Sequence, residues 1–563
     1  MLLNISKEVL SILDKNFKLK VLLIVIFFLI FSIIEIIGIS SIFFFLNTVS
    51  SGNIDNIIKY LNFFKLDNLN YNQVIYLLGI CTIIIILFRN SFVIVQEYIN
   101  NNFLISLEAD LRKKLLKNYI NQDSIFLGSN KSSSLFSVLY NHLSTLVHGT
   151  VNNLITIFSE LIIILVLSTF LIFNSSSYSI LIISLSIVSY LFFFIIFKKK
   201  IKNIGTKRVL EINKFFSLLQ QTLKSIKEIK IYDYLSFVVK DIYKNNVRIK
   251  NIIIKFRIIN IFPKQILEVT LIIFLVLFVI FQIDTNFNNK NLIEELIFLA
   301  VVFYRLTPRV DNFLKSLFAI QFNSKAYDLI KDHLELKNFD VKKIFRLKDT
   351  IELKNIKFSY NKNKNFKLGP INLVLKKNKI YGLKGENGSG KSTLVEILSG
   401  LAQANQGSIK IDNREINYYK EKISVSYIPQ KSFFFNSTIL ENLQLGARNP
   451  SLVTLKKKLK EVNALSIFES LNLNYDYMIN EDNTNLSGGQ IQRLSIIRAL
   501  LKKSDVIIFD ESTNAIDKKS ENNILSLLKR IKSNKIILLI SHSQNVLDYS
   551  DISIFMKDGK IIK

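Results

Sequence analysis

The first 325 residues of this 563-residue chain carry recurring apolar runs, which stop in the second half of the chain. A helix needs about 20 mainly apolar residues to cross the hydrocarbon core of a bilayer. Helices satisfy their own backbone polar groups, which the bilayer cannot do. We therefore expect residues 1–325 to form an α-helical transmembrane domain. Its six spans are predicted at about 21–46, 73–99, 151–173, 177–197, 258–282 and 292–322.

The polar segments between these spans differ in charge. Residues 100–150 and 198–257 are rich in Lys and Arg, whereas 48–72, 174–176 and 283–291 carry almost no net charge. Segments rich in Lys and Arg stay on the cytoplasmic side of a membrane. The pattern predicts a multi-pass protein whose N-terminus, two basic segments and C-terminal half are all cytoplasmic.

The two basic segments are expected to continue the adjoining spans as long intracellular helices. Within 103–120 the apolar residues keep helical spacing; they are Phe103, Leu104, Leu107, Leu111, Leu115 and Leu116. Such helices could reach a cytosolic domain and transmit its motion. Ordinary solvated loops are the alternative, which the apolar stripe disfavours.

Composition limits the partners that the chain can have. The residues are 49% hydrophobic, and the formal net charge is +29. That charge would suit nucleic acid, anionic lipid or an anionic substrate, although AT-rich coding would also enrich Lys, Asn, Ile and Phe. Six spans exclude a role on ribosomes or DNA, so no nucleic-acid partner is expected. The single Cys81 lies in an apolar run, which excludes a disulfide framework.

Several charged residues lie at or near membrane depth, where they are costly and usually face a water-filled cavity or a partner. They are Glu35, Arg89, Glu160, Lys264, Glu268, Arg305 and Arg309. Arg89, Lys264 and Arg305 belong to three different spans and together could line a cavity suited to phosphate, which guanidinium groups bind well. Pairing between helices, or snorkelling at span ends, is the alternative for each.

After residue 325 the sequence changes to short apolar strands, glycines and helices. A linker is predicted over 326–348 and a nucleotide-binding domain over 349–563. The strand 379–383 leads into a G-x-x-x-x-G-K-S loop, and a helix follows, which is the context that a phosphate loop needs. The residues expected to bind ATP there are Gly385, Glu386, Asn387, Gly388, Ser389, Gly390, Lys391, Ser392 and Thr393.

Further site residues follow apolar strands. Asp510 is expected to bind Mg²⁺ with Ser392 and Gln430, and Glu511 would polarise or deprotonate the attacking water. Gln430 can reach metal and water, and His542 can contact the γ-phosphate. A lone Gln or His is more often structural, but here each ends a strand. Gln430, Glu511 and His542 are therefore the predicted catalytic residues, and Tyr360 could stack on adenine.

Together with Leu486-Ser-Gly-Gly-Gln490 and Asp517, these motifs resemble the ATPase of an ABC transporter across the predicted nucleotide-binding domain, 349–563. The resemblance implies a head-to-tail dimer, in which one copy closes on the ATP held by the other. The residues that would close are Ser487, Gly488, Gly489 and Gln490. With six spans ahead of one ATPase, the chain is similar to an exporter-type half-transporter.

The same resemblance bears on assembly and coupling. Glu511, the 486–490 motif and His542 are all intact, which favours a homodimer over an asymmetric heterodimer. The segments 122–128 and 227–234 would be the helices that couple the ATPase to the spans.

Four membrane segments resemble bacterial flippases for lipid-linked oligosaccharides. They are Ile33–Ser40, Leu87–Asn90, Phe262–Lys264 and Phe303–Pro308. The resemblance implies ATP-driven movement of a polyprenyl-pyrophosphate glycan from the inner to the outer leaflet of the bacterial inner membrane. Arg89, Lys264 and Arg305 would meet the pyrophosphate. A general lipid or multidrug exporter, and a peptide exporter lacking a protease domain, are the alternatives.

Overall fold

The computed structural model describes most of the chain in two units. The described residues are 7, 11, 14–51, 71–174, 177–284, 289–336, 343–360, 367–416, 421–447, 450–465, 475–480, 485–513 and 516–562. The first unit combines Met1–Ile120 with Asn130–Lys337, and the second combines Asn121–Ser129 with Asn338–Lys563. The short segment 121–129 thus belongs to the second unit, although it interrupts the first in sequence.

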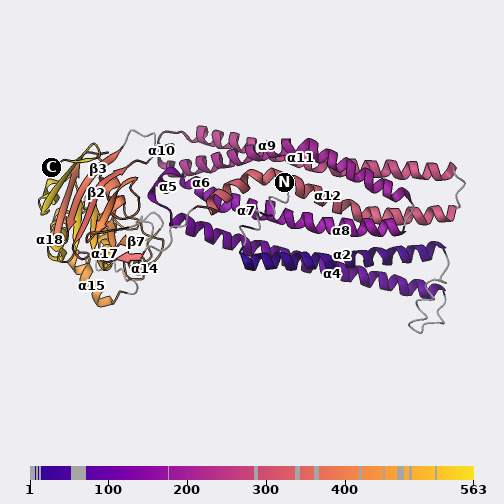
Figure 1. Ribbon diagram of the computed structural model, residues 1–563, viewed down its shortest axis with the longest axis horizontal. Helices are drawn as coiled ribbons and strands as arrows, with labels where there is room; N and C mark the ends of the chain where they lie inside the picture. Colours follow the sequence, from indigo (N-terminus) through magenta and orange to yellow (C-terminus); the bar gives the residue numbers. More distant parts are fainter. Residues whose placement is uncertain are drawn as a thin grey trace. The chain divides into compact units, whose positions relative to one another are not determined.

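The described residues of the first unit are helical almost throughout. Its long helices are α2 (Lys15–Ser51), α4 (Tyr71–Ile120), α8 (Asn152–Asn174), α9 (Ser177–Lys224), α11 (Leu235–Asp284) and α12 (Asn289–Leu334). Figure 1 shows them running alongside one another. Helix α2 packs on α4 and α8, and α9 packs on α11 and α12. A Cβ at Gly205 of α9 would collide with the carbonyl of Phe322 in α12, so glycine permits this close approach.

Shorter segments connect the long helices. Between α4 and α8 lie α6 (Ser132–Ser137), the π-helical turn η1 (Val138–His142), α7 (Leu143–Leu146) and a second π-helical turn, η2 (Val147–Val151). Helix α10 (Ile226–Ile231) lies between α9 and α11. It overlaps the segment 227–234, which the sequence predicts to couple the two domains, and residues 232–234 follow the helix.

The long helices extend well beyond a bilayer. Helix α4 has 50 residues, which at 1.5 Å per residue is about 75 Å, against about 30 Å for the hydrocarbon core. The predicted apolar stripe over 103–120 is buried, except for Leu116, which is exposed. Toward the other end of α4, Ile80, Ile83 and Leu87 are exposed, as expected of a surface in contact with lipid. The prediction that helices continue the spans well beyond membrane length is confirmed.

Each of the six predicted spans falls in one long helix, apart from Val151, which ends η2. Among the residues with described side chains, three stretches have the length and apolarity of a membrane span; they are Lys15–Leu46, Tyr71–Ile120 and Ser132–Thr169. The remaining predicted spans lie in α9, α11 and α12, where many side chains are outside the described set. The exact span boundaries therefore stay predictions.

The second unit is built on two main sheets. A mixed sheet has the strand order β12 (Lys560–Ile562), β11 (Ile552–Lys557), β4 (Lys379–Gly385), β10 (Ile536–Ile540), β9 (Val506–Asp510) and β8 (Val425–Ile428). All neighbouring strands in it are parallel except β11 and β12. An antiparallel sheet has the order β3 (Leu368–Lys376), β2 (Thr350–Phe358), β5 (Gln406–Ile411) and β6 (Arg414–Glu415). Strands β1 (Lys343–Phe345) and β7 (Glu421–Ile423) pair in a separate two-stranded sheet. Residues 343–345 fall within the predicted linker, 326–348.

The mixed sheet is buried on both faces, as parallel sheets usually are. On β9 and β10 successive side chains alternate between two hydrophobic cores: Phe509 and Leu539 belong to one, and Ile508 and Leu538 to the other. The helices of this unit are α5 (Ser124–Ser129), α13 (Lys391–Leu398), α14 (Ile439–Gln444), α15 (Leu452–Glu461), α17 (Gly488–Leu501), α18 (Lys518–Ile531) and α19 (Gln544–Leu547). Parallel pairing brings the carboxyl ends of β4, β8, β9 and β10 to one edge.

Candidate nucleotide-binding site

The phosphate loop lies between β4, which ends at Gly385, and α13, which begins at Lys391. Its glycines are required by geometry. Gly388 and Gly390 have φ of 83° and 101°, a region that side chains with a Cβ rarely adopt. A Cβ at Gly385 would lie 2.6 Å from Ser389 Oγ. The loop therefore turns back on itself directly before the N-terminus of α13, where backbone N–H groups are free to bind phosphate.

Two side chains of the loop are poised around that space. Lys391 is largely buried, and its Nζ donates hydrogen bonds to the carbonyls of Gly385 at 2.6 Å and Glu386 at 3.0 Å. Ser389 Oγ is buried and has no hydrogen-bond partner in the described part of the protein. A buried hydroxyl without a partner is costly.

The carboxylates at the end of β9 each have specific partners. Tyr427 donates its hydroxyl to Asp510 Oδ2 at 2.8 Å. Gln430 Nε2 donates to Glu511 Oε2 at 2.9 Å, and His542 Nε2 lies 3.3 Å from Glu511 Oε1. Burial raises the pKa of Asp510, as does the neighbouring charge of Glu511, while the Tyr427 hydrogen bond opposes the rise.

These groups line one cavity of about 670 Å³. Its lining residues are Tyr360, Asn387, Gly388, Gly390, Lys391, Ser392, Thr393, Gln430, Asp510, Glu511 and His542. The cavity thus brings together the predicted adenine, metal and catalytic residues and most of the predicted phosphate loop, whereas Gly385, Glu386 and Ser389 do not line it. A cavity of this size is of the order expected for a small-molecule ligand.

The 486–490 motif does not line this cavity. Ser487 is instead the N-cap of α17: its Oγ accepts the Gln490 N–H at 3.3 Å, and Gln490 Oε1 accepts the Ser487 N–H at 2.7 Å. Such a capping box satisfies backbone donors that a helix start would otherwise leave free. Gly488 and Gly489 form the first turn of the helix.

The predicted Mg²⁺ ligands suit an ion that is bound partly by the protein and partly by the nucleotide. Ser392, Gln430 and Asp510 all line the cavity and offer the oxygen donors that Mg²⁺ prefers. Among the described residues, no group of three or more His, Cys, Asp or Glu side chains could hold a metal ion alone. The donor set therefore suits an ion that is bound jointly with phosphate oxygens.

Tyr427 was not predicted as a site residue. It lies three residues before Gln430 on β8, the parallel neighbour of β9. The signal for it was a tyrosine near the end of a strand that leads to Gln430. Strand order is needed to interpret that signal, and the sequence alone does not give the order.

Three arginines of the membrane helices meet at Glu35 of α2. Arg89 Nε and Nη2 lie 2.7 Å and 3.0 Å from its two carboxylate oxygens. Arg305 and Arg309 of α12 approach Glu35 at 3.8 Å and 3.5 Å. Arg309 also lies 3.5 Å from Glu160 of α8. We call these five residues, from four helices, the arginine cluster.

The structure brings two of the three predicted substrate residues together, namely Arg89 and Arg305. Lys264 is instead paired within its own helix, α11, at 3.5 Å from Glu268, and both of these residues are partly exposed. Arg309 takes the third cationic position in the cluster. Its sequence position, four residues after Arg305, places it on the same face of the helix.

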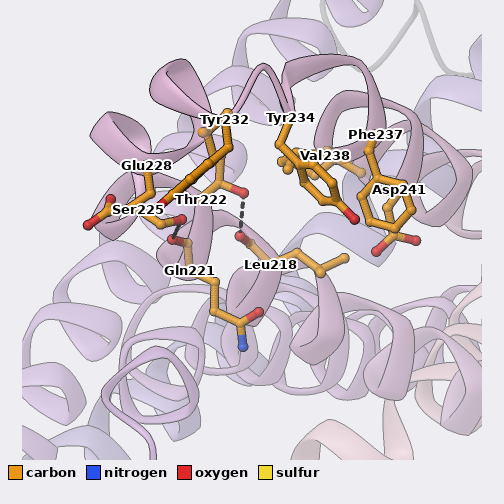
Figure 2. A pocket seen from close by; sticks show the side chains of 12 residues that line it. Leu218, Gln221, Thr222, Ser225, Glu228, Tyr232, Tyr234, Phe237, Val238 and Asp241 are labelled. Atoms are coloured by element: carbon orange, nitrogen blue, oxygen red, sulfur yellow. Dashed lines mark hydrogen bonds between the residues drawn. The ribbon is translucent and has the colours of Figure 1, made fainter.

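A second cavity, of about 540 Å³, lies at the junction of α9, α10 and α11. Figure 2 shows Tyr232, Tyr234 and Phe237 around it. The Thr222 hydroxyl donates to the Leu218 carbonyl of α9, and the Ser225 hydroxyl donates to the Gln221 carbonyl of the same helix. Its lining is mainly apolar and aromatic. This chemistry suits packing against another protein surface better than it suits catalysis.

Comparison with known proteins identifies the class. The model of the ABC transporter transmembrane region matches residues 21–306, and the ABC transporter model matches residues 368–514. The chain therefore belongs to the ABC transporters. More particularly, it is an exporter-type half-transporter, in which one membrane domain precedes one ATPase domain.

Similar proteins agree with this class. A "Probable ABC transporter ATP-binding/permease protein" of Haemophilus influenzae is 34% identical over 242 residues, which are 42% of this chain and 43% of that protein. An "ATP-dependent lipid A-core flippase" of Wigglesworthia glossinidia brevipalpis is 26% identical over 512 residues, covering 87% and 86%. The solved structure of a bacterial Atm1-family ABC exporter with ATP bound has a TM-score of 0.78 at 16% identity, over 98% of this chain and 94% of that one. The last likeness shows a shared fold.

Membership of this family settles the general chemistry. The second unit binds ATP, and the chain is an ATP hydrolase whose activity is coupled to transport across a membrane. The apolar helices of the first unit make it a multi-pass membrane protein.

Proposed function

We propose that this chain works as a homodimer that flips a lipid-linked oligosaccharide, a polyprenyl-pyrophosphate glycan, across the bacterial inner membrane. The movement would run from the inner to the outer leaflet, with the N-terminus and the ATPase domain in the cytoplasm. The basic segments 100–150 and 198–257 support this orientation. The proposed domain limits are 1–325, 326–348 and 349–563.

The arginine cluster carries the substrate part of the proposal. Three guanidinium groups, of Arg89, Arg305 and Arg309, face two carboxylates, so the cluster is net positive. Charge at membrane depth is costly and is usually kept for function. A pyrophosphate offers several oxygens that can each accept paired hydrogen bonds from arginine. Arg89 and Arg305 would bind it, and Lys264 would add a further positive charge as the lipid passes.

The relatives' names support lipid cargo over a peptide. Several are called ATP-dependent lipid A-core flippases, a name that describes those proteins. A general lipid or multidrug exporter is the alternative, since its cavity would be mainly apolar and aromatic. The buried charges of this chain favour an anionic head group over an uncharged drug.

The ATP site would work as follows. The loop 385–393 would hold the phosphates, Tyr360 would stack on adenine, and Ser392, Gln430 and Asp510 would hold Mg²⁺, which neutralises phosphate charge. Glu511 would orient and deprotonate the attacking water, with Gln430 and His542 fixing its carboxylate. Ser487, Gly488, Gly489 and Gln490 do not line the cavity of their own chain, so a second copy would have to supply them.

Coupling would use the two short helices at the ends of the long ones. Helix α5 belongs to the ATPase unit although it is joined to membrane helices on both sides. The region around α10 carries the aromatic cavity of Figure 2. Both positions support the proposal that 122–128 and 227–234 transmit motion between the domains.

The proposal is tested by substrate-stimulated hydrolysis in lipid nanodiscs. ATP turnover is measured with an undecaprenyl-pyrophosphate glycan, with undecaprenyl monophosphate and with phosphatidylethanolamine. We expect strong stimulation by the pyrophosphate lipid alone, and its loss in Arg89→Ala and in Arg305→Ala. Lys325→Ala, an exposed lysine on α12, is the matched control and should behave as the wild type.

Two results would contradict the proposal. Stimulation that survives both arginine substitutions would remove the pyrophosphate-binding role. Stimulation by uncharged amphiphiles, with none by the pyrophosphate lipid, would favour the general exporter.

A further inference from the structure

Glu396 of α13 connects the nucleotide cavity to helix α5. Its Oε2 accepts hydrogen bonds from Tyr360 Oη at 3.1 Å and from Ser124 Oγ at 3.0 Å. Tyr360 lines the cavity, whereas Ser124 begins α5. One carboxylate oxygen therefore serves both the proposed adenine-binding side chain and the segment that joins the ATPase unit to the membrane helices.

The chain of hydrogen bonds continues into the phosphate loop. Tyr360 Oη also lies 3.0 Å from Thr393 Oγ1. Because a carboxylate can only accept, the single phenolic proton goes to Glu396, and Thr393 must donate to Tyr360. Thr393 follows the predicted Mg²⁺ ligand Ser392 and also lines the cavity. The order of the chain is thus Thr393, Tyr360, Glu396, Ser124.

Helix α5 is otherwise held to the same part of the ATPase unit. The Ser124 N–H donates to the Leu401 carbonyl at 2.8 Å, and the Leu401 N–H donates to the Glu396 carbonyl at 2.8 Å. Ile125 packs against the core that contains α13. Movement of α5 would therefore shift Ser124 directly against Glu396.

We propose that Glu396 is a positioning residue that couples the seating of α5 to the orientation of Tyr360, and so to the affinity for ATP. When α5 is seated, Ser124 fixes the carboxylate, which fixes the phenol and with it the ring that would stack on adenine. Coupling of this kind is reciprocal, so nucleotide binding also stabilises the seated position of α5. The inference rests on the proposed role of Tyr360 at adenine.

ATP binding to the full-length protein in nanodiscs tests the connection, with Glu511→Gln included to prevent turnover. Ser124→Ala, Tyr360→Phe and Glu396→Ala should each weaken ATP binding by about threefold to tenfold, the value of one hydrogen bond. In the double variant, the loss of ATP affinity should be smaller than the product of the losses caused by Ser124→Ala and Tyr360→Phe alone. Adding Ser124→Ala to Glu396→Ala should cause no further loss of ATP affinity. Glu396→Gln, which keeps an acceptor oxygen, should retain most of the affinity.

Hydrogen exchange of residues 121–129 gives a readout that a purely structural role would not change. ATP should increase amide protection there in the otherwise wild-type protein, and this increase should vanish in Glu396→Ala. Equal protection by ATP in both proteins would overturn the inference, as would fully multiplicative effects in the double variant. Ser526→Ala, whose hydroxyl bonds to its own helix, is the control for a lost serine.

Tyr360→Ala separates this inference from the proposed site. If Tyr360→Ala leaves ATP affinity unchanged, the adenine role of Tyr360 fails. If Tyr360→Ala weakens ATP binding but Ser124 and Glu396 substitutions do not, the adenine role stands and the coupling through Glu396 fails.

Discussion

Glu511 is held in place by contacts within its own chain. Its φ of 47° lies in the left-handed region, which costs free energy for a residue with a side chain and is often found at functional sites. Its N–H donates to the Ile540 carbonyl, so β10 holds this conformation. Gln430 and His542 each reach a different oxygen of the carboxylate. As the proposed general base, a carboxylate oriented in this way would need little reorganisation when water and phosphate bind.

Tyr427 gives a prediction about pH. Its hydrogen bond stabilises ionised Asp510, whose pKa is raised by burial. In Tyr427→Phe that opposing hydrogen bond is lost, so the Asp510 pKa rises further. Since the proposed binding of Mg²⁺ by Asp510 needs the ionised carboxylate, the acid limb of ATP hydrolysis should move to higher pH.

The pH dependence of the hydrolysis rate at a fixed, subsaturating Mg²⁺ concentration checks this expectation. Tyr477→Phe is the matched control, because Tyr477 packs against the core and does not line the cavity. An acid limb in Tyr427→Phe that stays in place or moves to lower pH would contradict the account.

At the scale of elements, two helices of the ATPase unit begin with the same kind of cap. Ser487 and Gln490 form a capping box on α17, and Thr438 and Glu441 form one on α14. Replacing either N-cap residue by alanine should lower the free energy of unfolding by about 1 kcal/mol. Thermal or denaturant unfolding of the two variants measures this common effect.

The two caps should differ in function. Ser487→Ala should also impair ATP-driven closure of two copies, because Ser487 would contact the partner's ATP, whereas Thr438→Ala should not. Crosslinking or light scattering with ATP, in a Glu511→Gln background, distinguishes the variants. Equal closure by both would limit Ser487 to its capping role.

Elements governed by local patterns could be predicted from sequence. The helical stripe over 103–120 and the strands before Gly385 and Glu511 follow from spacing and apolar runs, and the structure contains them. Strand β1 was placed in a linker because three residues pairing with the distant β7 leave no periodic signal. Leu116 keeps helical spacing yet is exposed, since spacing alone does not mark the edge of a buried face.

At the scale of the whole molecule, the sequence predicted the class of protein but not its long-range contacts. Charges in the spans were evident, but the meeting of Arg89, Arg305 and Arg309 at Glu35 depends on how α2, α4 and α12 pack. The inclusion of 121–129 in the ATPase unit is also a tertiary fact. The motifs that line the ATP cavity could be found from sequence because each follows an apolar strand. The Ser124–Glu396 contact could not, because it joins residues far apart in the chain.

The central claim is that ATP hydrolysis by this chain moves an anionic glycolipid between leaflets. Its most direct test is flipping of a fluorescent undecaprenyl-pyrophosphate oligosaccharide in proteoliposomes, with ATP added outside to copies whose ATPase faces outward. The account predicts ATP-dependent movement from the outer to the inner vesicle leaflet by the wild type. It also predicts a reduction of about a hundredfold or more in Glu511→Gln, the loss expected for a general base. Absence of ATP-dependent flipping by the wild type, or undiminished flipping by Glu511→Gln, would contradict it.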